Sequence, residues 1–483
     1  MLRRSFLAFL VCVFAPLAGW SQDPPLDPTG IRGRVLLVGS GPVPQGVIEG
    51  FWRSVSGAEP VLVVGGDRAL FDAIDASAGD KKTRPQRLTL EDSAKITGGL
   101  KTARAVWFAD MGAEKLTAAD LARATRDLLG RDGVVVLSGK SLAAINGSAQ
   151  LLPDCVVQDK ALAGAIAVSV PAETALWIEG RRLSVLGKGF VTLRLAASKA
   201  RPERTISLKA KTTEDLTGLR RAALERLHET KAKPEAPEVA KGTLIIIGGG
   251  GYPKGILERF VKLAGGPKAS IVVLPTANDP LPKKEGIAEA FRKLGAKEVT
   301  VLDGRTRERV ESEKSLAAFG RATGVWFGGG RQWRFVDAYA GSKAQPLMKE
   351  TLARGGVIGG TSAGATIQGD YLCRGSPLEN FSIAYEGYER GLGFLPGVAI
   401  DQHFTQRKRF ADMTGLMKSR PEFLGIGIDE TTAIVVQGHI AEVTGKGKVH
   451  FYDAGRKRKD GEADYEALGA GERYDLKLRR KGE

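Results

Sequence analysis

The chain has 483 residues, of which 43% are hydrophobic and only 7% aromatic, and it contains 62 glycines. This length allows several domains with sizeable cores, and the glycines favour an α/β protein with tight turns over a β-sandwich. The net charge of +16 is dispersed, without interleaved aromatic residues, so we expect no nucleic-acid partner. No apolar run reaches the roughly 18 residues of a membrane span, so the mature chain is not expected to enter a membrane.

Residues 1–21 have the order of a secretory signal peptide. Arg3 and Arg4 precede a short apolar run, and small residues follow as far as Ser21, after which we expect cleavage. The arginine pair is also typical of twin-arginine signals, so both this route and the general secretory route stay open. We therefore expect a periplasmic or secreted protein.

Two cysteines remain after such a cleavage, Cys155 and Cys373. They are far apart in the chain, and neither has a cysteine or histidine neighbour at metal-ligand spacing. We expect both to be core thiols, and we expect neither a metal site nor a cofactor.

The second half of the chain repeats a pattern from the first. Residues 33–51 align without a gap with residues 242–260, and each segment predicts a continuous apolar strand, a glycine-rich turn and a helix. The likeness continues at 105–108 and 324–327, and later in segments that alternate apolar and polar residues as a hairpin does. We expect two tandem α/β copies, each built on a parallel sheet and each ending in a β-hairpin.

The repeat sets the expected domain boundaries. Residues 30–210 would form the first copy and residues 242–455 the second. Between them, residues 211–241 predict a charged helix followed by a proline-containing linker. Residues 456–483 are rich in charge and glycine and are expected to form a loosely held tail.

The second copy carries a candidate nucleophile at Ser362. Residues 360–364, Gly-Thr-Ser-Ala-Gly, fit the pattern G-x-S-x-G and lie between an apolar strand and a predicted helix. Small neighbours are needed because such a serine sits on a sharp strand-to-helix turn, and the helix N-terminus favours developing negative charge. The first copy has Gly139 at this position and no histidine before His228, so we expect it to be non-catalytic.

A nucleophilic serine needs a base, and the chain has four histidines. His228 falls in the charged helix, and His439 and His450 fall in the last predicted hairpin, at expected surface positions. His403 remains, with polar neighbours, just after a strand-like run. We therefore expect His403 to be the base.

A serine and a histidine base usually work with a third residue, a carboxylate that orients the imidazole. Glu430 is the candidate because it follows a buried-type strand, and Asp429 beside it is the alternative. The chain order of serine, histidine and acid differs from the serine, acid and histidine order of α/β-hydrolases. We therefore expect a fold other than that of the α/β-hydrolases to bring the serine, histidine and acid into the same arrangement.

These motifs resemble those of the cyanophycinases, within a family of serine peptidases that also includes α-aspartyl dipeptidase. The resemblance covers essentially all of residues 242–440 and implies a flavodoxin-like, class I glutamine amidotransferase-like fold. The motifs are Ile-Gly-Gly-Gly at 247–250, Phe-Gly-Gly-Gly-Arg-Gln at 327–332, Gly-Gly-Thr-Ser-Ala-Gly-Ala at 359–365, Asp-Gln-His-Phe at 401–404 with Arg407 and Arg409, and Gly-Ile-Asp-Glu at 427–430.

The resemblance also implies roles for single residues. It implies a Ser362–His403–Glu430 triad that works through an acyl-enzyme. The oxyanion hole would come from backbone amides of Gly329, Gly330 and Ala363. The implied substrate is cyanophycin, a poly-aspartate chain with arginine on each β-carboxyl, which is cut to β-Asp-Arg dipeptides; a homodimer is a compatible assembly. Implied substrate contacts are Gln332, Asp401, Gln402, Arg407 and Arg409.

Two residues depart from the family pattern. Arg331 stands where the family usually has an acid, and Asp412 stands where a third arginine is expected, nine residues after the histidine. Both changes bear on the substrate, which could be a related β-aspartyl or isoaspartyl peptide. Two alternatives stay open: an aspartyl or isoaspartyl dipeptidase acting on small peptides, and a polymer-binding protein that has lost catalysis.

Overall fold

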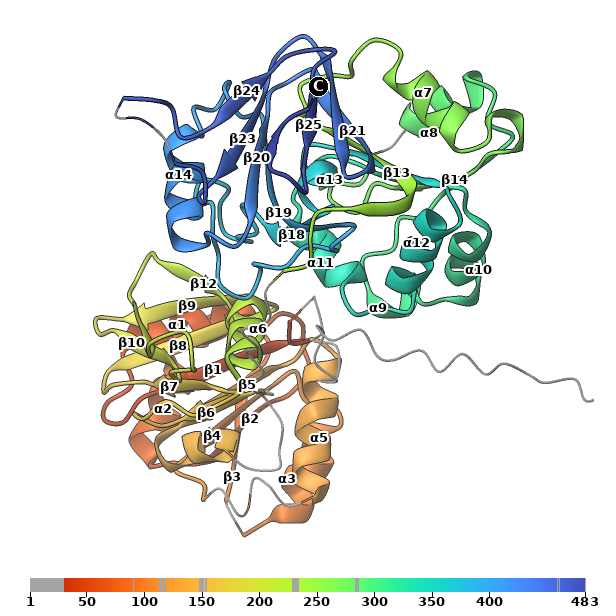
Figure 1. Cartoon of the computed structure of the whole chain (residues 1–483). Helices are drawn as coiled ribbons and strands as arrows, with labels where there is room; N and C mark the ends of the chain where they lie inside the picture. Colours follow the sequence, from red (N-terminus) through yellow and green to blue (C-terminus); the bar gives the residue numbers. More distant parts are fainter. Residues whose placement is uncertain are drawn as a thin grey trace, which may run out of the picture.

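The computed structural model describes residues 30–482, apart from 90, 113–114, 116–118, 147–151, 153, 228–233, 283–285, 458 and 460. The predicted signal peptide at 1–21 lies outside the described residues, as does His228, which the sequence analysis set aside as a base. The chain forms two α/β halves with mixed sheets, drawn in red to yellow and in green to blue in Figure 1, so the α/β part of the predicted fold class is confirmed. No helix in the described part of the chain is long and apolar enough to cross a membrane.

The first half is built on a mixed sheet with the order β12-β9-β8-β1-β5-β4-β2-β3. Its parallel strands are β1 (Arg34–Val38), β2 (Val61–Gly65), β3 (Pro85–Leu88), β4 (Ala105–Ala109) and β5 (Val134–Ser138), and its antiparallel strands are β8 (Thr174–Glu179), β9 (Arg182–Gly187) and β12 (Thr213–Asp215). A second sheet contains β6 (Cys155–Val157), β7 (Ile166–Ser169), β10 (Val191–Leu195) and β11 (Arg204–Leu208). Helices α1 (Gln45–Ser54) and α2 (Arg68–Ala76) cover one face of the large sheet. Its other face meets the second sheet and helices α3 (Ser93–Leu100), α5 (Ala119–Gly130) and α6 (Leu216–Leu227).

The second half has a larger mixed sheet with the order β15-β14-β16-β17-β13-β21-β22-β25-β26. Its parallel strands are β13 (Val239–Ile247), β14 (Ser270–Leu274), β15 (Glu298–Val301), β16 (Gly324–Phe327) and β17 (Val357–Thr361), followed by the antiparallel β21 (Thr432–Gly438), β22 (Ile440–Gly445), β25 (Arg473–Asp475) and β26 (Arg480–Lys481). A second sheet contains β18 (Gly369–Leu372), β19 (Leu395–Gln402), β20 (Leu424–Ile428), β23 (Val449–Asp453) and β24 (Glu466–Leu468). The helices are α7 (Ile256–Leu263), α8 (Gly286–Lys293), α9 (Arg307–Val310), α10 (Glu313–Arg321), α11 (Trp333–Tyr339), α12 (Ala344–Ala353), α13 (Ala363–Thr366) and α14 (Phe410–Ser419).

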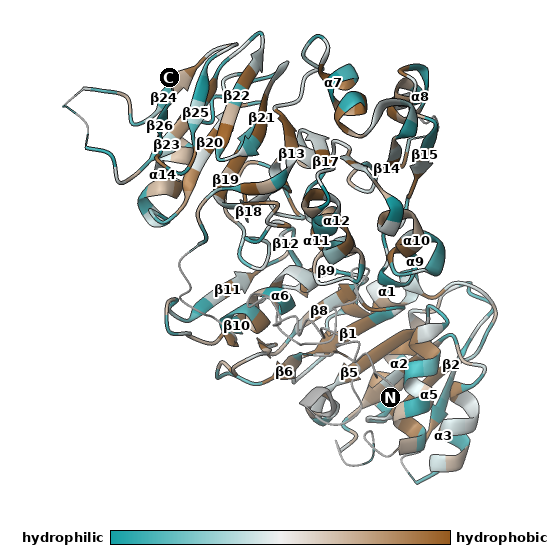
Figure 2. Ribbon diagram, turned by 45° about the vertical axis from the view of Figure 1, so that its right-hand side comes forward, coloured by the Kyte–Doolittle hydropathy of each residue, from teal (hydrophilic) through white to brown (hydrophobic). Residues whose placement is uncertain are grey.

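The continuous apolar run of β13 is explained by burial on both faces. Ile245 and Ile247 contact the core beneath α7 and α8, whereas Leu244 and Ile246 contact the core formed with α10, α11, α12 and the second sheet. Parallel strands covered on both faces read as unbroken apolar segments rather than alternating ones. Figure 2 shows these strands as brown ribbons between more polar helices.

The order of the parallel strands differs from the flavodoxin-like prediction. A flavodoxin-like sheet has the order 2-1-3-4-5. Here the first parallel strand of each half lies next to the fifth, as β1 does beside β5 and β13 beside β17. Apolar periodicity marks a strand as buried but does not indicate its neighbours. The glutamine amidotransferase-like assignment and the duplication of one unit stay predictions.

The predicted hairpin pairs and the charged helix of the linker are present, but the hairpins, the linker and the tail continue into strands that the sequence analysis did not predict. β8 pairs antiparallel with β9 and β21 with β22, but the chain continues beyond both pairs into further strands. Within the predicted linker, β12 extends the first sheet, and α6 contributes Leu219 and Ala222 to the core of the first half. In the predicted tail, the ring of Tyr474 on β25 stacks on Phe451 with 3.9 Å between centroids. Charge-rich composition concealed these short strands, because each contains at most one buried apolar residue.

The docked C-terminal strands predict a contrast between two leucines. Leu476 is fully buried, so Leu476→Ala is expected to lower the free energy of unfolding by about 2–5 kcal/mol. Leu478 is 59% exposed, so Leu478→Ala should change that free energy by less than about 0.5 kcal/mol. Urea unfolding followed by tryptophan fluorescence measures both variants, and equal losses would contradict the docking of these strands.

Candidate active site

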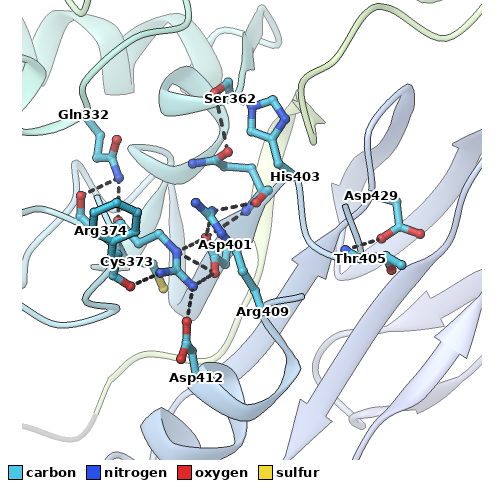
Figure 3. A network of polar contacts seen from close by, with 12 residues as sticks. Gln332, Ser362, Cys373, Arg374, Asp401, His403, Thr405, Arg409, Asp412 and Asp429 are labelled. Atoms are coloured by element: carbon cyan, nitrogen blue, oxygen red, sulfur yellow. Dashed lines mark hydrogen bonds and ion pairs between the residues drawn. The ribbon is translucent and has the colours of Figure 1, made fainter. Parts of the chain in front are cut away.

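The candidate residues lie where strands of two sheets end. Ser362 directly follows β17 of the larger sheet, His403 directly follows β19, and Glu430 comes two residues after β20. β19 and β20 are parallel neighbours in the smaller sheet. Ligands of open α/β sheets bind at the carboxyl ends of parallel strands. The two sheets therefore bring these ends together at one place (Figure 3).

Ser362 has a strained backbone conformation. Its φ is 55° and its ψ is −114°, a region that residues with a side chain rarely adopt. Its amide donates to Ile247 O at 3.0 Å, and α13 begins at the next residue. The hydroxyl thus stands on the sharp strand-to-helix turn that the sequence pattern predicts.

The glycines on either side of Ser362 are required by close backbone contacts. A Cβ on Gly360 would lie 2.3 Å from Gly364 O, and a Cβ on Gly364 would lie 2.1 Å from Phe327 O. Neither carbonyl can move without disturbing the turn or β16. The spacing G-x-S-x-G is therefore a packing requirement of this turn.

Ser362, His403 and Glu430 form a hydrogen-bonded chain. Ser362 Oγ lies 3.0 Å from His403 Nε2, and His403 Nδ1 lies 2.6 Å from Glu430 Oε1. Ser362 Oγ also lies 3.5 Å from Gln402 Oε1. The imidazole is almost buried, whereas the Glu430 side chain is 34% exposed. This arrangement can pass a proton from the hydroxyl to an imidazole whose ring is held by a carboxylate.

Asp429, the alternative acid, is used elsewhere. Its Oδ1 accepts the amide of Thr405 and its Oδ2 accepts the amide of Lys448, each at 3.0 Å. His450 Nε2 lies 3.5 Å from Asp429 Oδ1. Burial opposes the charged form, but these hydrogen bonds lower the pKa of Asp429 to about 2. Asp429 therefore fastens β20 to β23, and Glu430 is the acid that meets the imidazole.

His450 is buried, so its predicted surface position is wrong. Its ring lies among Phe404, Phe410 and Tyr465, with centroids 5.1 to 5.3 Å away. By contrast, the side chain of His439 is 42% exposed. Strand alternation alone did not indicate which face of β23 would be covered by α14.

Two glycines that the sequence analysis gave no individual role lie against His403 and Glu430. A Cβ on Gly249 would come 2.4 Å from His403 Cε1, and a Cβ on Gly250 would come 2.4 Å from Glu430 Oε2. The main chain of the same loop accepts from the amide of His403 at Gly248 O and from the amide of Thr431 at Gly249 O, both at 2.8 Å. The glycine-rich turn after β13 therefore seats the imidazole and the carboxylate.

The surroundings of His403 favour its neutral form. Burial of the ring lowers the pKa of His403 below its ordinary value of 6.5. The positive charge of Arg407 lowers it further, while the hydrogen bond to Glu430 acts in the opposite direction. Neutral imidazole can accept a proton, so His403 keeps this capacity at lower pH than an ordinary histidine.

The predicted oxyanion loop lies beside the serine. A Cβ on Gly329 would stand 3.6 Å from Ser362 Cβ, which places this residue directly against the hydroxyl-bearing turn. Gly330 has φ 130°, and a Cβ there would come 2.2 Å from Ala277 O. The next amide, that of Arg331, donates to Ala277 O at 2.9 Å. The loop is thus fixed to the end of β14 while it passes Ser362.

Four of the five predicted substrate contacts are buried in protein contacts, as Figure 3 shows for Gln332, Asp401 and Arg409. Gln332 Nε2 donates to the carbonyls of Cys373 and Arg374 at 2.8 and 2.6 Å. Arg409 Nη1 donates to Asp401 Oδ1 and to the carbonyl of Gln402, each at 2.7 Å. The fifth residue, Arg407, is exposed.

Arg374 was missed by the sequence analysis and lies at the centre of this network. Its Nε donates to both oxygens of Asp401 at 3.1 and 3.0 Å, and its Nη2 donates to Asp412 Oδ2 at 2.7 Å. Asp401 is therefore a fully buried carboxylate between two guanidinium groups, those of Arg374 and Arg409. No local motif marks Arg374, because its partners lie 27 and 38 residues away.

The two departures from the family pattern both stabilise the loop that contains Arg374. Asp412 binds the Arg374 guanidinium, so positive charge still lies next to the position where an arginine is expected. Arg331 Nη2 donates to the carbonyls of Ser376 and Glu379. An acid at residue 331 could not make these bonds, since it has no donor when ionised.

The position in the first half that corresponds to Ser362 is closed. Gly139 directly follows β5 and has φ 59°, and a Cβ there would come 2.0 Å from Asp110 Oδ1. The neighbouring hydroxyls are used in the core: Ser138 Oγ accepts from Trp107 Nε1 at 3.0 Å and Ser141 Oγ accepts from the amide of Met111 at 2.9 Å. This turn offers no exposed nucleophile.

Comparison with known proteins identifies the family. Residues 244–444 match the model of Peptidase family S51. A cyanophycinase of Geminocystis herdmanii is 35% identical over 220 residues, which cover 44% of this chain and 81% of that protein. A cyanophycinase of Trichormus variabilis is 31% identical over 242 residues, which cover 48% of this chain and 81% of that protein.

Two solved structures are also similar. A peptidase from an acI-B1 Actinobacterium has a TM-score of 0.38 and 22% identity, over 50% of this chain and 98% of its own. A putative peptidase E from Listeria monocytogenes has a TM-score of 0.32 and 18% identity, over 43% of this chain and 100% of its own. From the family match and the two cyanophycinases, we conclude that this chain belongs to peptidase family S51 and is a serine-type peptidase.

Proposed function

We propose that this chain is an exported peptidase that degrades cyanophycin to β-Asp-Arg dipeptides, with Ser362 as nucleophile, His403 as base and Glu430 as the orienting acid. The observation that carries the proposal is the hydrogen-bonded chain from Ser362 Oγ through the imidazole to Glu430. The proposed substrate is supported by the similarity of this chain to two cyanophycinases, over 81% of the length of each.

The first step is attack of Ser362 Oγ on the scissile carbonyl carbon. His403 Nε2 takes the hydroxyl proton as the C–O bond forms, and Glu430 stabilises the resulting imidazolium. The carbonyl oxygen becomes an oxyanion, for which the amides of Gly329, Gly330 and Ala363 are the proposed donors. The amides of Ser362 and Arg331 are already bonded to main-chain carbonyls and are excluded from this role.

The second step breaks the C–N bond. His403 returns its proton to the leaving amine, and an ester of Ser362 remains. Water then attacks this ester, giving its proton to His403, and collapse of the second tetrahedral intermediate releases the acid product with the proton returned to Ser362. No group outside the chain and water is needed to balance the protons.

The charges around the site set which side chains could touch the substrate. Asp401 and Arg409 neutralise each other in the interior, so we propose that they shape the site rather than contact the polymer. Arg407 is exposed beside the base and is the proposed partner of a substrate carboxylate. The altered Arg331 and Asp412 keep a small β-aspartyl or isoaspartyl peptide as the second candidate substrate.

We further propose that residues 30–210 are a non-catalytic copy of the second half and that residues 1–21 direct export. The parallel strands of both halves follow the same order relative to their chain positions, which supports duplication. The closed turn at Gly139 supports loss of catalysis. The arginine pair and apolar run of the N-terminus support export.

Replacing the nucleophile tests the class of enzyme. Ser362→Ala should lower kcat on the order of 10⁶-fold, because the proposed acyl-enzyme cannot form without this hydroxyl. Purified wild type and variant are incubated with cyanophycin and with α- and β-aspartyl dipeptides, and the released products are measured by chromatography. The matched variant Ser138→Ala should retain activity, since that hydroxyl bonds only to Trp107 Nε1 and to the carbonyl of Phe108, both in the core of the first half. Cleavage by Ser362→Ala, or by neither protein, contradicts the proposal.

Replacing the two neighbouring acids separates catalysis from stability. Glu430→Gln should lower kcat on the order of 10⁴-fold, because the ring loses the carboxylate that orients it. Asp429→Asn should instead lower the free energy of unfolding by about 1–3 kcal/mol and change kcat little. Steady-state kinetics and urea unfolding of both variants distinguish these outcomes, and the reverse pattern would assign the role to Asp429.

The pH profile tests the role of His403. The base must be neutral, and the pKa of His403 is lowered. The midpoint of the acid limb of the kcat/KM profile should therefore lie below a pH of about 6.5, where an ordinary histidine would place it. Arg407→Gln removes a charge that lowers this pKa, so the limb should move to higher pH. Lys408→Gln, at the next exposed position, should leave the limb in place. Identical profiles for all three proteins would argue against His403 as the base.

A further inference from the structure

Two elements that border the active site also contact the first half of the chain. One is α11, which begins directly after Gln332 of the oxyanion loop. The other is the segment 373–391 between β18 and β19, called here the arginine-bound loop, which begins next to Arg374. Figure 1 shows α11 and β18 on the side of the second half that faces α6 and β12.

α11 is held through a buried carboxylate. Asp337 Oδ2 accepts from Arg181 Nη1 at 2.6 Å, and Arg221 Nη2 lies 3.0 Å from Asp337 Oδ1. Tyr388 of the arginine-bound loop donates its hydroxyl to Asp337 Oδ1 at 2.7 Å. The Arg181 guanidinium also lies 4.4 Å from the centroid of the Trp333 ring. A single carboxylate thus joins both active-site elements to two arginines of the first half and α6.

The arginine-bound loop has a second anchor at Glu386. Its carboxylate accepts from Arg226 Nε, and the guanidinium groups of Arg201 and Arg204 lie 3.3 and 3.2 Å away. Glu389 forms a further pair with Arg201 at 2.7 Å. The backbone also approaches α6 closely, because a Cβ on Gly387 would come 2.3 Å from Gly218 O.

The other end of the loop is connected to the catalytic histidine. Arg374 binds Asp401, two residues before His403, and Gln332 binds the carbonyls of Cys373 and Arg374. The loop is therefore held at one end by the first half and at the other by the network behind the triad. Buried ion pairs add little net stability, but loss of one partner leaves an uncompensated charge, so they restrict the arrangement of the loop.

We infer that the first half, with α6, is a positioning unit that holds α11 and the arginine-bound loop and so shapes the substrate side of the site. Glu386 is its main positioning residue in the second half. This inference rests on the proposed function, because it assigns the loop to the substrate of the Ser362 site. It predicts that weakening the anchor affects substrate binding while the triad itself remains assembled.

The test compares Glu386→Gln with Glu442→Gln in the full chain. Glu442 accepts two hydrogen bonds from Arg259 at 3.1 and 3.2 Å, in an ion pair that involves neither the first half nor the loop. For each protein, three quantities are measured: kcat and KM on the best substrate of the panel, the rate at which a small fluorophosphonate labels Ser362, and amide hydrogen exchange across 373–391.

For Glu386→Gln we expect KM to rise about tenfold, faster exchange across 373–391, and fluorophosphonate labelling within about twofold of wild type. Glu442→Gln should match wild type in all three. An unchanged KM and unchanged exchange in folded Glu386→Gln would overturn the inference. If that variant does not fold, Arg204→Gln, which removes a partly exposed partner of Glu386, should give the same changes at smaller size. Wild type that neither cleaves nor labels refutes the proposed function, whereas the exchange comparison still decides the positioning role.

Discussion

The contact between the turn after β13 and the ends of β19 and β20 is the constraint on which the site depends. Ser362 belongs to one sheet, and His403 and Glu430 belong to another. Two main-chain hydrogen bonds, from the amides of His403 and Thr431, fix the two sheets at this point. They allow so close an approach only because residues 249 and 250 lack a Cβ. A side chain at either position would displace the imidazole or the carboxylate before it affected the nucleophile.

The network next to His403 shows how buried charges can fix the end of a strand. Asp401 has no exposed surface and lies between Arg374 and Arg409. A buried carboxylate with two guanidinium partners is satisfied only in one geometry, since each lost bond leaves an unpaired charge. Because Arg409 also binds the carbonyl of Gln402, this geometry extends to the residue before His403. The charges thereby fix the end of β19, which His403 directly follows.

The catalytic candidates could be predicted from the sequence because each lies in a short local pattern. Ser362 stands in a small-residue turn, His403 directly follows an apolar strand, and Glu430 comes two residues after another. Arg374 could not be found in this way, since its importance comes from Asp401 and Asp412, which lie far away in the sequence. The predictions of the strand order and of a surface position for His450 were wrong for a related reason. Periodicity indicates which faces of an element are apolar, but it does not indicate which elements lie next to it. The C-terminal strands were not predicted, because the charged residues in this segment outnumber its few buried apolar residues.

The turns after β5 and β17 show that similar backbone angles do not give similar chemistry. Gly139 has a positive φ, as Ser362 does, but the Asp110 carboxylate occupies the space that a side chain at residue 139 would need. The turn after β5 therefore leaves no room for a serine at this residue. The first half also meets the second half through ion pairs, in which the buried Asp337 of α11 and the half-buried Glu386 of the arginine-bound loop bind arginines. Arginine suits this place because its planar, always charged group can bind a carboxylate and still donate to carbonyls, as Arg226 does with those of Ala196 and Pro202. The same arginines therefore connect the first half to α11 and to the arginine-bound loop, the two elements that adjoin Gln332 and Arg374.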